Sequence, residues 1–197
     1  MRNLWKLGLS VLVVLVATGC AHRMITEHPA SAPSGSAPSG DSRLYEVTVS
    51  RVVPAYVNGG SAISVIILAN KENYEQILPI SVGIPEGRSI NMVLKKRVSP
   101  RPGTHDLFAS VLGQFHTKLV KVVITDLRED TYIATMTMES YGETKDIDAR
   151  PSDGIALALR CVAPIFVSEQ VIRKGGWMKA PQQNEKHTEE RKKDNLL

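Results

Sequence analysis

The feature that most constrains the fold is a set of short runs rich in β-branched residues, grouped in threes, with a helical stretch after each group. Val, Ile and Thr favour strands, and residues 131–139 alternate with the period of two that a strand requires. We therefore predict an α+β fold, a mostly antiparallel sheet with about three helices, in which a strand-strand-strand-helix unit occurs twice. The predicted strands are 44–53, 62–69, 76–82, 119–126, 131–139, 145–149 and 165–167, and the predicted helices are 86–96, 104–115 and 152–162.

The two ends of the chain carry segments of a different kind. Residues 1–19 combine charge, a short apolar run and small residues, which is typical of a secretory signal. Cys20 follows Ala-Thr-Gly, which resembles the bacterial lipobox, so we predict a lipoprotein signal peptide over 1–19 and lipidation at Cys20. Residues 20–42 are predicted to be a flexible Ser/Ala/Pro/Gly tether, and residues 179–197 a disordered polar tail. The folded domain is therefore expected over 43–178.

This layout predicts a membrane-anchored lipoprotein on the periplasmic or cell-surface side, in the outer membrane where the cell has one. An uncleaved anchor helix, or a secreted protein with an incidental cysteine, is the alternative. The chain has 24 Lys and Arg against 20 Asp and Glu, a formal net charge of +4, which is less than a protein that wraps nucleic acid usually carries. Removal of Arg2 and Lys6 with the signal peptide would leave 22 basic against 20 acidic residues, a charge of +2.

The densest group of polar residues lies where the predicted strand 145–149 meets the helix after it. Alternation along the strand would place Asp148 and Arg150 on one face. Ser152 and Asp153 begin the helix, and a helix N-terminus with an arginine beside it suits an anionic phosphate. A carboxylate there could hold a divalent metal or act as a general base. The same residues also fit an ordinary helix N-cap beside a surface ion pair, and both interpretations stay open.

A second polar group lies in the proline-containing loop before the predicted helix 104–115. Four cations, at positions 95, 96, 97 and 101, lead to His105 and Asp106. Because histidine side chains in general titrate near neutral pH, His105 could serve as an acid, a base or a metal ligand; the alternative is a partly exposed residue without a role. The sequence contains no P-loop, GxSxG, HExxH or paired CxxC motif.

These two groups, in this order and at this distance, resemble the bifunctional nuclease domain family. The resemblance runs from about Leu78 to Ile172 and rests on LPISVGIPEG at 78–87, RPGTHDL at 101–107 and KDIDARPSDGIALALRCVAPIFVSEQV at 145–171. The last stretch is the most specific. The chain departs from the family pattern at Gly87-Arg88-Ser89, where a small, alanine-rich helix start is expected.

The resemblance implies a nuclease that hydrolyses phosphodiester bonds of DNA, RNA or both. Nucleic acid would be its partner, and a homo-oligomer is a further expectation. The alternative is a non-catalytic envelope lipoprotein that binds a ligand or a protein partner through the same cleft. On the positions that match the family motifs we place three sets of hypothetical roles. They are His105, Asp106, Asp148 and Asp153 as catalytic residues; Arg101, Arg150 and Ser152 as phosphate-binding residues; and Glu86, Asp148 and Asp153 as ligands of Mg²⁺ or Mn²⁺.

Overall fold

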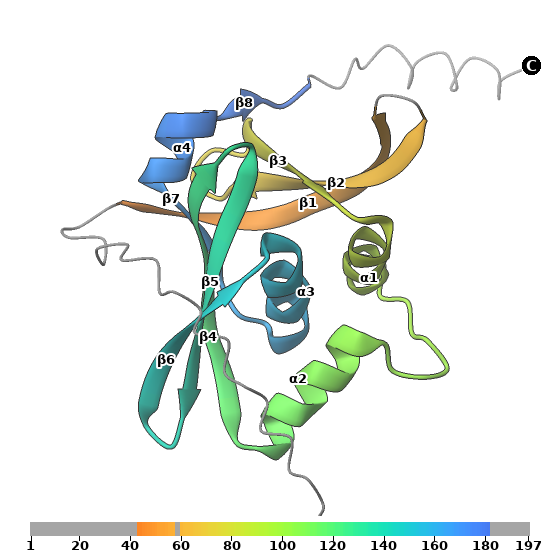
Figure 1. The fold of residues 1–197 in the computed structure, drawn as a ribbon, viewed down its shortest axis with the longest axis vertical. Helices are drawn as coiled ribbons and strands as arrows, with labels where there is room; N and C mark the ends of the chain where they lie inside the picture. The colour runs from red at the N-terminus through yellow and green to blue at the C-terminus, as the bar shows by residue number, and fades with distance from the viewer. Residues whose placement is uncertain (1–42, 58–59, 182–197) are drawn as a thin grey trace, which may run out of the picture. The chain divides into compact units, whose positions relative to one another are not determined.

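The computed structural model describes residues 43–57 and 60–181. The predicted signal peptide, Cys20, the tether and most of the tail lie outside the described residues. Within them, one eight-stranded sheet and four helices form the predicted α+β fold (Figure 1). The strands are β1 Leu44–Val57, β2 Ser61–Asn70, β3 Gln76–Val82, β4 Thr117–Arg128, β5 Thr131–Ser140, β6 Glu143–Ala149, β7 Ile165–Ser168 and β8 Met178–Lys179, and the helices are α1 Ile84–Leu94, α2 Thr104–Gln114, α3 Pro151–Cys161 and α4 Glu169–Gly175.

The strands of the sheet lie in the order β6-β5-β4-β7-β1-β2-β3-β8. The predicted repeat is present in this order. Strands β1, β2 and β3 pair antiparallel in sequence and lead into α1, and strands β4, β5 and β6 do the same and lead into α3. Between the two groups lies β7, which is antiparallel to β1 and parallel to β4. The sequence did not predict α4 or β8, because α4 has seven residues of which only Val171 is buried, and β8 has two.

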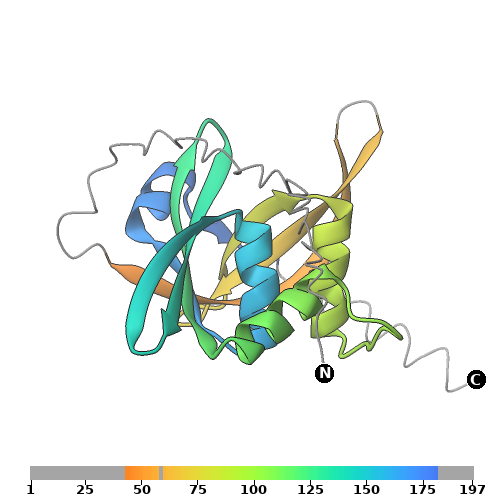
Figure 2. The ribbon, with the colours of Figure 1, turned by 60° about the horizontal axis from the view of Figure 1, so that its bottom comes forward.

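Glycines bring α1 and α3 close to the sheet at corresponding places of the two repeats. A Cβ atom on Gly87 would clash with the side chain of Ser64 on β2, and one on Gly154 would lie 2.8 Å from Val122 on β4. Each glycine lies in the first turn of its helix. Because both helices also contact each other, the first turns of the two repeats meet on one side of the sheet (Figure 2).

The apolar face of α2 is only partly covered. Ala109 and Leu112 pack against the main core, and α2 contacts α3 and β4. Among the described residues of α2 none is buried, and Leu107 and Phe108 are exposed. His105 therefore lies in the first turn of a helix that is only weakly buried. In the part of the chain that the structure describes, no helix is long and apolar enough to cross a membrane.

Candidate active site

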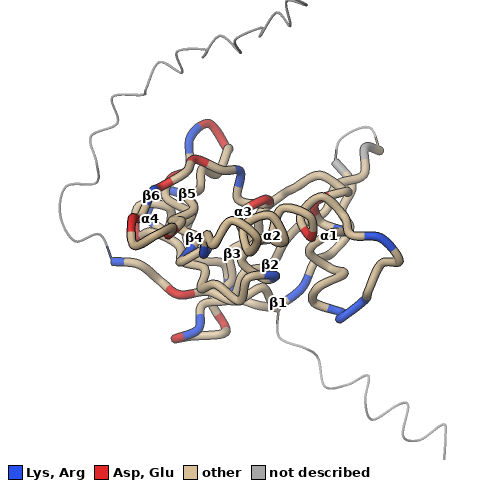
Figure 3. The backbone as a smooth tube through the Cα atoms, turned by 90° about the horizontal axis from the view of Figure 1, so that it is seen from below, with Lys and Arg blue, Asp and Glu red and all other residues tan. Residues whose placement is uncertain are grey.

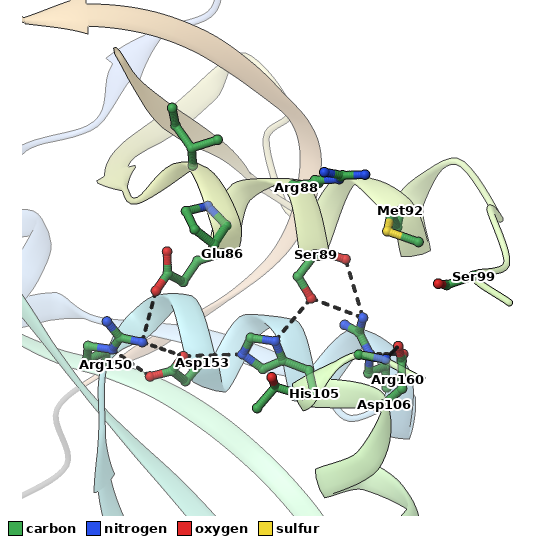
Figure 4. A pocket seen from close by; sticks show the side chains of 14 residues that line it. Glu86, Arg88, Ser89, Met92, Ser99, His105, Asp106, Arg150, Asp153 and Arg160 are labelled. Carbon is green, nitrogen blue, oxygen red and sulfur yellow. Dashed lines mark hydrogen bonds and ion pairs between the residues drawn. The ribbon is translucent and has the colours of Figure 1, made fainter. Parts of the chain in front are cut away.

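A cleft of about 510 Å³ lies between α1, α3 and the first turn of α2. Figure 4 shows that its polar side chains form one hydrogen-bonded row. In order along the row they are Glu86, Arg150, Asp153, His105, Ser89, Arg160 and Asp106. Three segments far apart in the sequence therefore supply one continuous polar network.

Arg150 joins the two acidic residues of the corresponding helix starts. Its Nε and Nη2 atoms donate to Oδ2 and Oδ1 of Asp153 at 2.7 and 3.0 Å, and Nη2 also donates to Oε1 of Glu86 at 3.1 Å. The Arg150 side chain is nevertheless 66% exposed. Within residues 43–57 and 60–181, its Nη1 atom has no hydrogen-bond partner. The guanidinium is thus fixed on one edge and open to solvent on the other.

Asp153 is held in its ionised form. Burial opposes ionisation of this carboxyl, but the hydrogen bonds from Arg150 and His105 outweigh burial, so the pKa of Asp153 lies below its usual value. The second bond joins Oδ1 of Asp153 to Nε2 of His105 at 3.2 Å. Asp153 therefore provides a negative charge beside the imidazole.

His105 is enclosed by partners on both ring nitrogens. Its Nδ1 atom lies 3.0 Å from Oγ of Ser89, and its side chain is 15% exposed. Such a ring, with a carboxylate on one nitrogen and a hydroxyl on the other, can take a proton from the hydroxyl side while the carboxylate stabilises the resulting cation. The arrangement is therefore suited to general acid–base chemistry.

Asp106 and Arg160 fix α2 against α3. Asp106 accepts the backbone N–H of Gly103 at 2.8 Å and Nε of Arg160 at 2.6 Å, so both of its oxygens have partners. The hydrogen bond from Arg160, followed by that from Gly103, lowers the pKa of Asp106. Because the carboxylate closes the first turn of α2, it sets the position of the neighbouring His105. These contacts suit a residue that positions His105, and the catalytic role that the sequence suggested for Asp106 stays a prediction.

The other sequence-predicted residues lie outside this row. Ser152 is buried and lines a second hollow, which shares Glu86 and Arg150 with the cleft. Arg101 lines a third hollow that shares Asp106 and Arg160 with the cleft. Asp148 is exposed on β6 and lines none of these three hollows. The structure thus brings Glu86, His105, Asp106, Arg150 and Asp153 into the cleft, and their chemical roles stay predictions.

Sequence reasoning did not single out two members of the row, Ser89 and Arg160. A helical spacing could have found both. Ser89 follows Glu86 by three residues in α1, and Arg160 follows Asp153 by seven in α3, so each shares a helix face with a predicted site residue.

The three carboxylates predicted to hold Mg²⁺ or Mn²⁺ do not share a location. Asp148 lies apart on β6, and the guanidinium of Arg150 is bonded to both Glu86 and Asp153, where a cation would have to bind. Among the described residues, no group of three or more His, Cys, Asp or Glu side chains is arranged to hold a metal ion. The side chains as arranged do not fit a divalent cation. Metal dependence stays a prediction.

Basic side chains flank the cleft on one side. In Figure 3, segments of the loop between α1 and α2 carry the colour of Lys and Arg. The basic residues of this loop are Lys95, Lys96, Arg97 and Arg101. Arg97 and Arg101 line the third hollow together with Arg160. A polyanion that entered the cleft would therefore meet cations beyond Arg150.

The chain belongs to the bifunctional nuclease domain family, whose sequence pattern matches residues 66–179. An uncharacterised protein of Mycobacterium tuberculosis is 32% identical over 123 residues, which cover 62% of this chain and 73% of that relative. A protein of Oryza sativa subsp. japonica named bifunctional nuclease 1 is 26% identical over 114 residues, 56% of this chain and 34% of that relative. The chain thus spans about a third of the rice protein. The matched region includes all seven side chains of the row.

Proposed function

We propose that the protein hydrolyses phosphodiester bonds of nucleic acid in the cleft between α1, α2 and α3. The observation that carries the proposal is the contact of His105 with Asp153, whose other partner is the exposed guanidinium of Arg150. One group suited to proton transfer and one suited to phosphate binding thus share a carboxylate. Membership of the bifunctional nuclease domain family supports the same chemistry.

Arg150 is the phosphate-binding group of this proposal. Its Nη1 atom, which none of these bonds uses, can donate a charge-assisted hydrogen bond to a phosphate oxygen. Glu86 and Asp153 keep the guanidinium in place before the substrate arrives. The basic loop between α1 and α2 would bind neighbouring phosphates of the same strand.

His105 is the proton-transfer group. It accepts a proton from the nucleophile that attacks the phosphorus and later gives a proton to the leaving oxygen of the sugar. During this exchange the ring carries a positive charge, and the ionised Asp153 stabilises it. General acid–base catalysis of this kind typically contributes about 10²–10⁴-fold to a rate.

The test is a cleavage assay with the full chain and its His105→Ala variant. The substrates are end-labelled single- and double-stranded DNA and RNA, each with EDTA, with Mg²⁺ and with Mn²⁺. We expect the wild-type chain to cleave at least one substrate and the variant to be at least about 100-fold slower. The matched control is His116→Asn, since His116 is exposed, lies just after α2 and has a positive φ that asparagine tolerates.

Two outcomes would contradict the proposal. Equal cleavage by the wild type and His105→Ala would show that the site is elsewhere. Binding of nucleic acid without cleavage under every metal condition would replace the proposal by the binding-module alternative.

We also propose that the protein acts outside the cytosol, tethered by a lipid at Cys20. This part rests on residues 1–20 of the sequence alone. We expect the wild-type chain in the membrane fraction of the producing bacterium and Cys20→Ala in the soluble fraction. Wild-type protein that fractionates like the variant would contradict the tether. A homo-oligomer stays a prediction, which the mass from light scattering would test.

A further inference from the structure

We propose that Ser89 is the nucleophile of the reaction and forms a transient phosphoseryl intermediate. This inference rests on the proposed function and names the group that attacks the phosphorus. Ser89, His105 and Asp153 form an unbroken hydrogen-bonded relay, with 3.0 Å between Oγ and Nδ1 and 3.2 Å between Nε2 and Oδ1. A nucleophile in contact with a base that a third group orients is the arrangement found in covalent hydrolases.

The donors and acceptors of the relay allow a proton to pass from Ser89 to a neutral His105. Arg160 can only donate, and its Nη2 atom donates to Oγ of Ser89 at 3.1 Å. The hydroxyl proton of Ser89 is then free to point at Nδ1 of a neutral His105, whose remaining N–H is on Nε2 and points at Asp153. In this arrangement Ser89 donates to His105 and His105 donates to Asp153, so each hydrogen bond of the relay has one donor and one acceptor.

Both ring nitrogens of His105 already have hydrogen-bond partners, so neither is free for a water molecule. Nε2 of His105 is bonded to Asp153 and Nδ1 to Ser89, so a water that needed His105 as its base would first have to displace one of them. The hydroxyl already in contact with the base belongs to Ser89, which lines the cleft. Arg160 adds a positive charge beside Oγ, which favours the negative charge that develops there on proton loss.

The reaction balances in two steps. In the first, Oγ of Ser89 forms a bond to the phosphorus of the diester, its proton passes to Nδ1 of His105, and the bond to one sugar oxygen breaks. The imidazolium gives its proton to that leaving oxygen. In the second, a water attacks the phosphorus and gives a proton to Nδ1, the bond from phosphorus to Oγ breaks, and the proton returns to Oγ. The sum is a diester and water giving a monoester and an alcohol.

Ser89 lies in α1, and it lines the cleft beside His105. In a purely structural role, the hydroxyl would only hold the ring of His105, and it would not become bonded to phosphorus. This difference makes covalent labelling the decisive measurement.

The experiment treats the full chain with diisopropyl fluorophosphate, a phosphorylating probe of activated serines, and follows the intact mass and the labelled peptide. We expect one adduct per chain on Ser89, no adduct in Ser89→Ala, and labelling at least about 100-fold slower in His105→Gln. The matched control is Ser110→Ala, because Ser110 is exposed on α2 and donates only to a backbone carbonyl. It should label like the wild type. Since the wild-type adduct is mapped directly, the result does not depend on how well Ser89→Ala folds.

Cleavage and labelling together separate the two proposals. Nucleic acid cleavage without an adduct on Ser89, and with full activity in Ser89→Ala, would overturn the nucleophile and leave the nuclease function standing. An adduct on Ser89 without cleavage of any nucleic acid would support the nucleophile and overturn the nuclease function. Labelling of other serines at the same rate as Ser89 would also overturn the inference.

Discussion

Asp126 and Asp153 are both carboxylates bonded to basic side chains, yet they lie in different surroundings. Asp126, on β4, is 6% exposed. Its oxygens accept the backbone N–H of Leu127 and the side chains of Arg128, Gln170 and Lys174. The bonds from Gln170 and Lys174 attach α4 to the sheet, and these side chains line neither the cleft nor the two hollows described with it. Asp153 instead shares its oxygens between an exposed arginine and a histidine, at the wall of a cleft.

The pKa alone does not distinguish these two carboxylates. Burial opposes ionisation of both, and the hydrogen bonds outweigh it in both, so each pKa lies below its usual value. The difference is in the partners. The side-chain cations on Asp126 are a lysine and an arginine, which keep their protons, whereas Asp153 contacts an imidazole that can exchange one. The carboxylate of the candidate active site is therefore distinguished by a partner that can exchange a proton and that lines a cleft.

The comparison is tested most strongly by Asp153→Asn. The amide removes the negative charge that stabilises protonated His105, so we expect cleavage to fall at least about 100-fold, or ~2.7 kcal/mol of transition-state free energy. The free energy of unfolding should change by under about 1 kcal/mol, because Asp153 and Arg150 are both partly exposed. Initial cleavage rates and urea denaturation measure the two effects. A variant with a much lower free energy of unfolding but a normal cleavage rate would give Asp153 the structural role that we assign to Asp126.

Asp126→Asn should have the opposite effect. Loss of the charge-assisted hydrogen bonds should lower the free energy of unfolding by about 2 kcal/mol at pH 7, with cleavage unchanged. Because the pKa of Asp126 is lowered in the folded chain, its contribution is complete above the usual value of 3.8 and is lost as the pH falls toward the folded-state value. Urea denaturation of the wild type and the variant should therefore show a smaller difference in the free energy of unfolding at pH 3 than at pH 7. A larger difference at pH 3 would contradict the lowered pKa.

The arginines bonded to Asp153 and Asp126 provide a matched test with a smaller expected effect. Arg150 and Arg128 are 66% and 57% exposed, and each bonds a carboxylate. Lysine keeps the charge but cannot hold Asp153 by two parallel hydrogen bonds while it donates to a phosphate, so Arg150→Lys should raise KM for nucleic acid about tenfold, or ~1.4 kcal/mol. Arg128→Lys should leave KM unchanged. Steady-state kinetics at fixed salt measures both, and an equal rise in the two variants would point to nonspecific charge effects.

Much of the fold could be predicted because the strands and the three longer helices carry clear periodicities. Gln76–Val82 has the predicted bounds, and the two strand-strand-strand-helix units follow the predicted order. The exposed face of α2 could not be foreseen, since apolar spacing shows which side of a helix is apolar and not how much of that side is covered. Likewise α4 is too short to give a periodic signal.

The candidate site was predictable where a motif marked it and unpredictable where contacts between helices made it. His105 and Asp153 stood out as titratable residues at helix starts. Ser89 did not: its spacing from Glu86 places it on the same helix face, but its contacts with His105 and Arg160 depend on how α1 approaches α2 and α3. Alternation along a strand was the least reliable guide, since it applies only while the strand continues. Arg150 lies past the end of β6 and forms the N-cap of α3, so its side chain reaches Glu86.

Asp148→Asn is the prediction with the smallest effect and separates the sequence interpretation from the structural one. Asp148 is exposed, pairs in register with Thr135 on β5, and lines neither the cleft nor the other two hollows described above. We therefore expect cleavage to stay within about twofold of the wild type, and the free energy of unfolding within about 0.5 kcal/mol, as for an ordinary surface position. Cleavage rates at several Mg²⁺ and Mn²⁺ concentrations provide the measurement. A large loss that added metal restores would instead place Asp148 in a metal site, and Arg150 would then have to move to admit the ion.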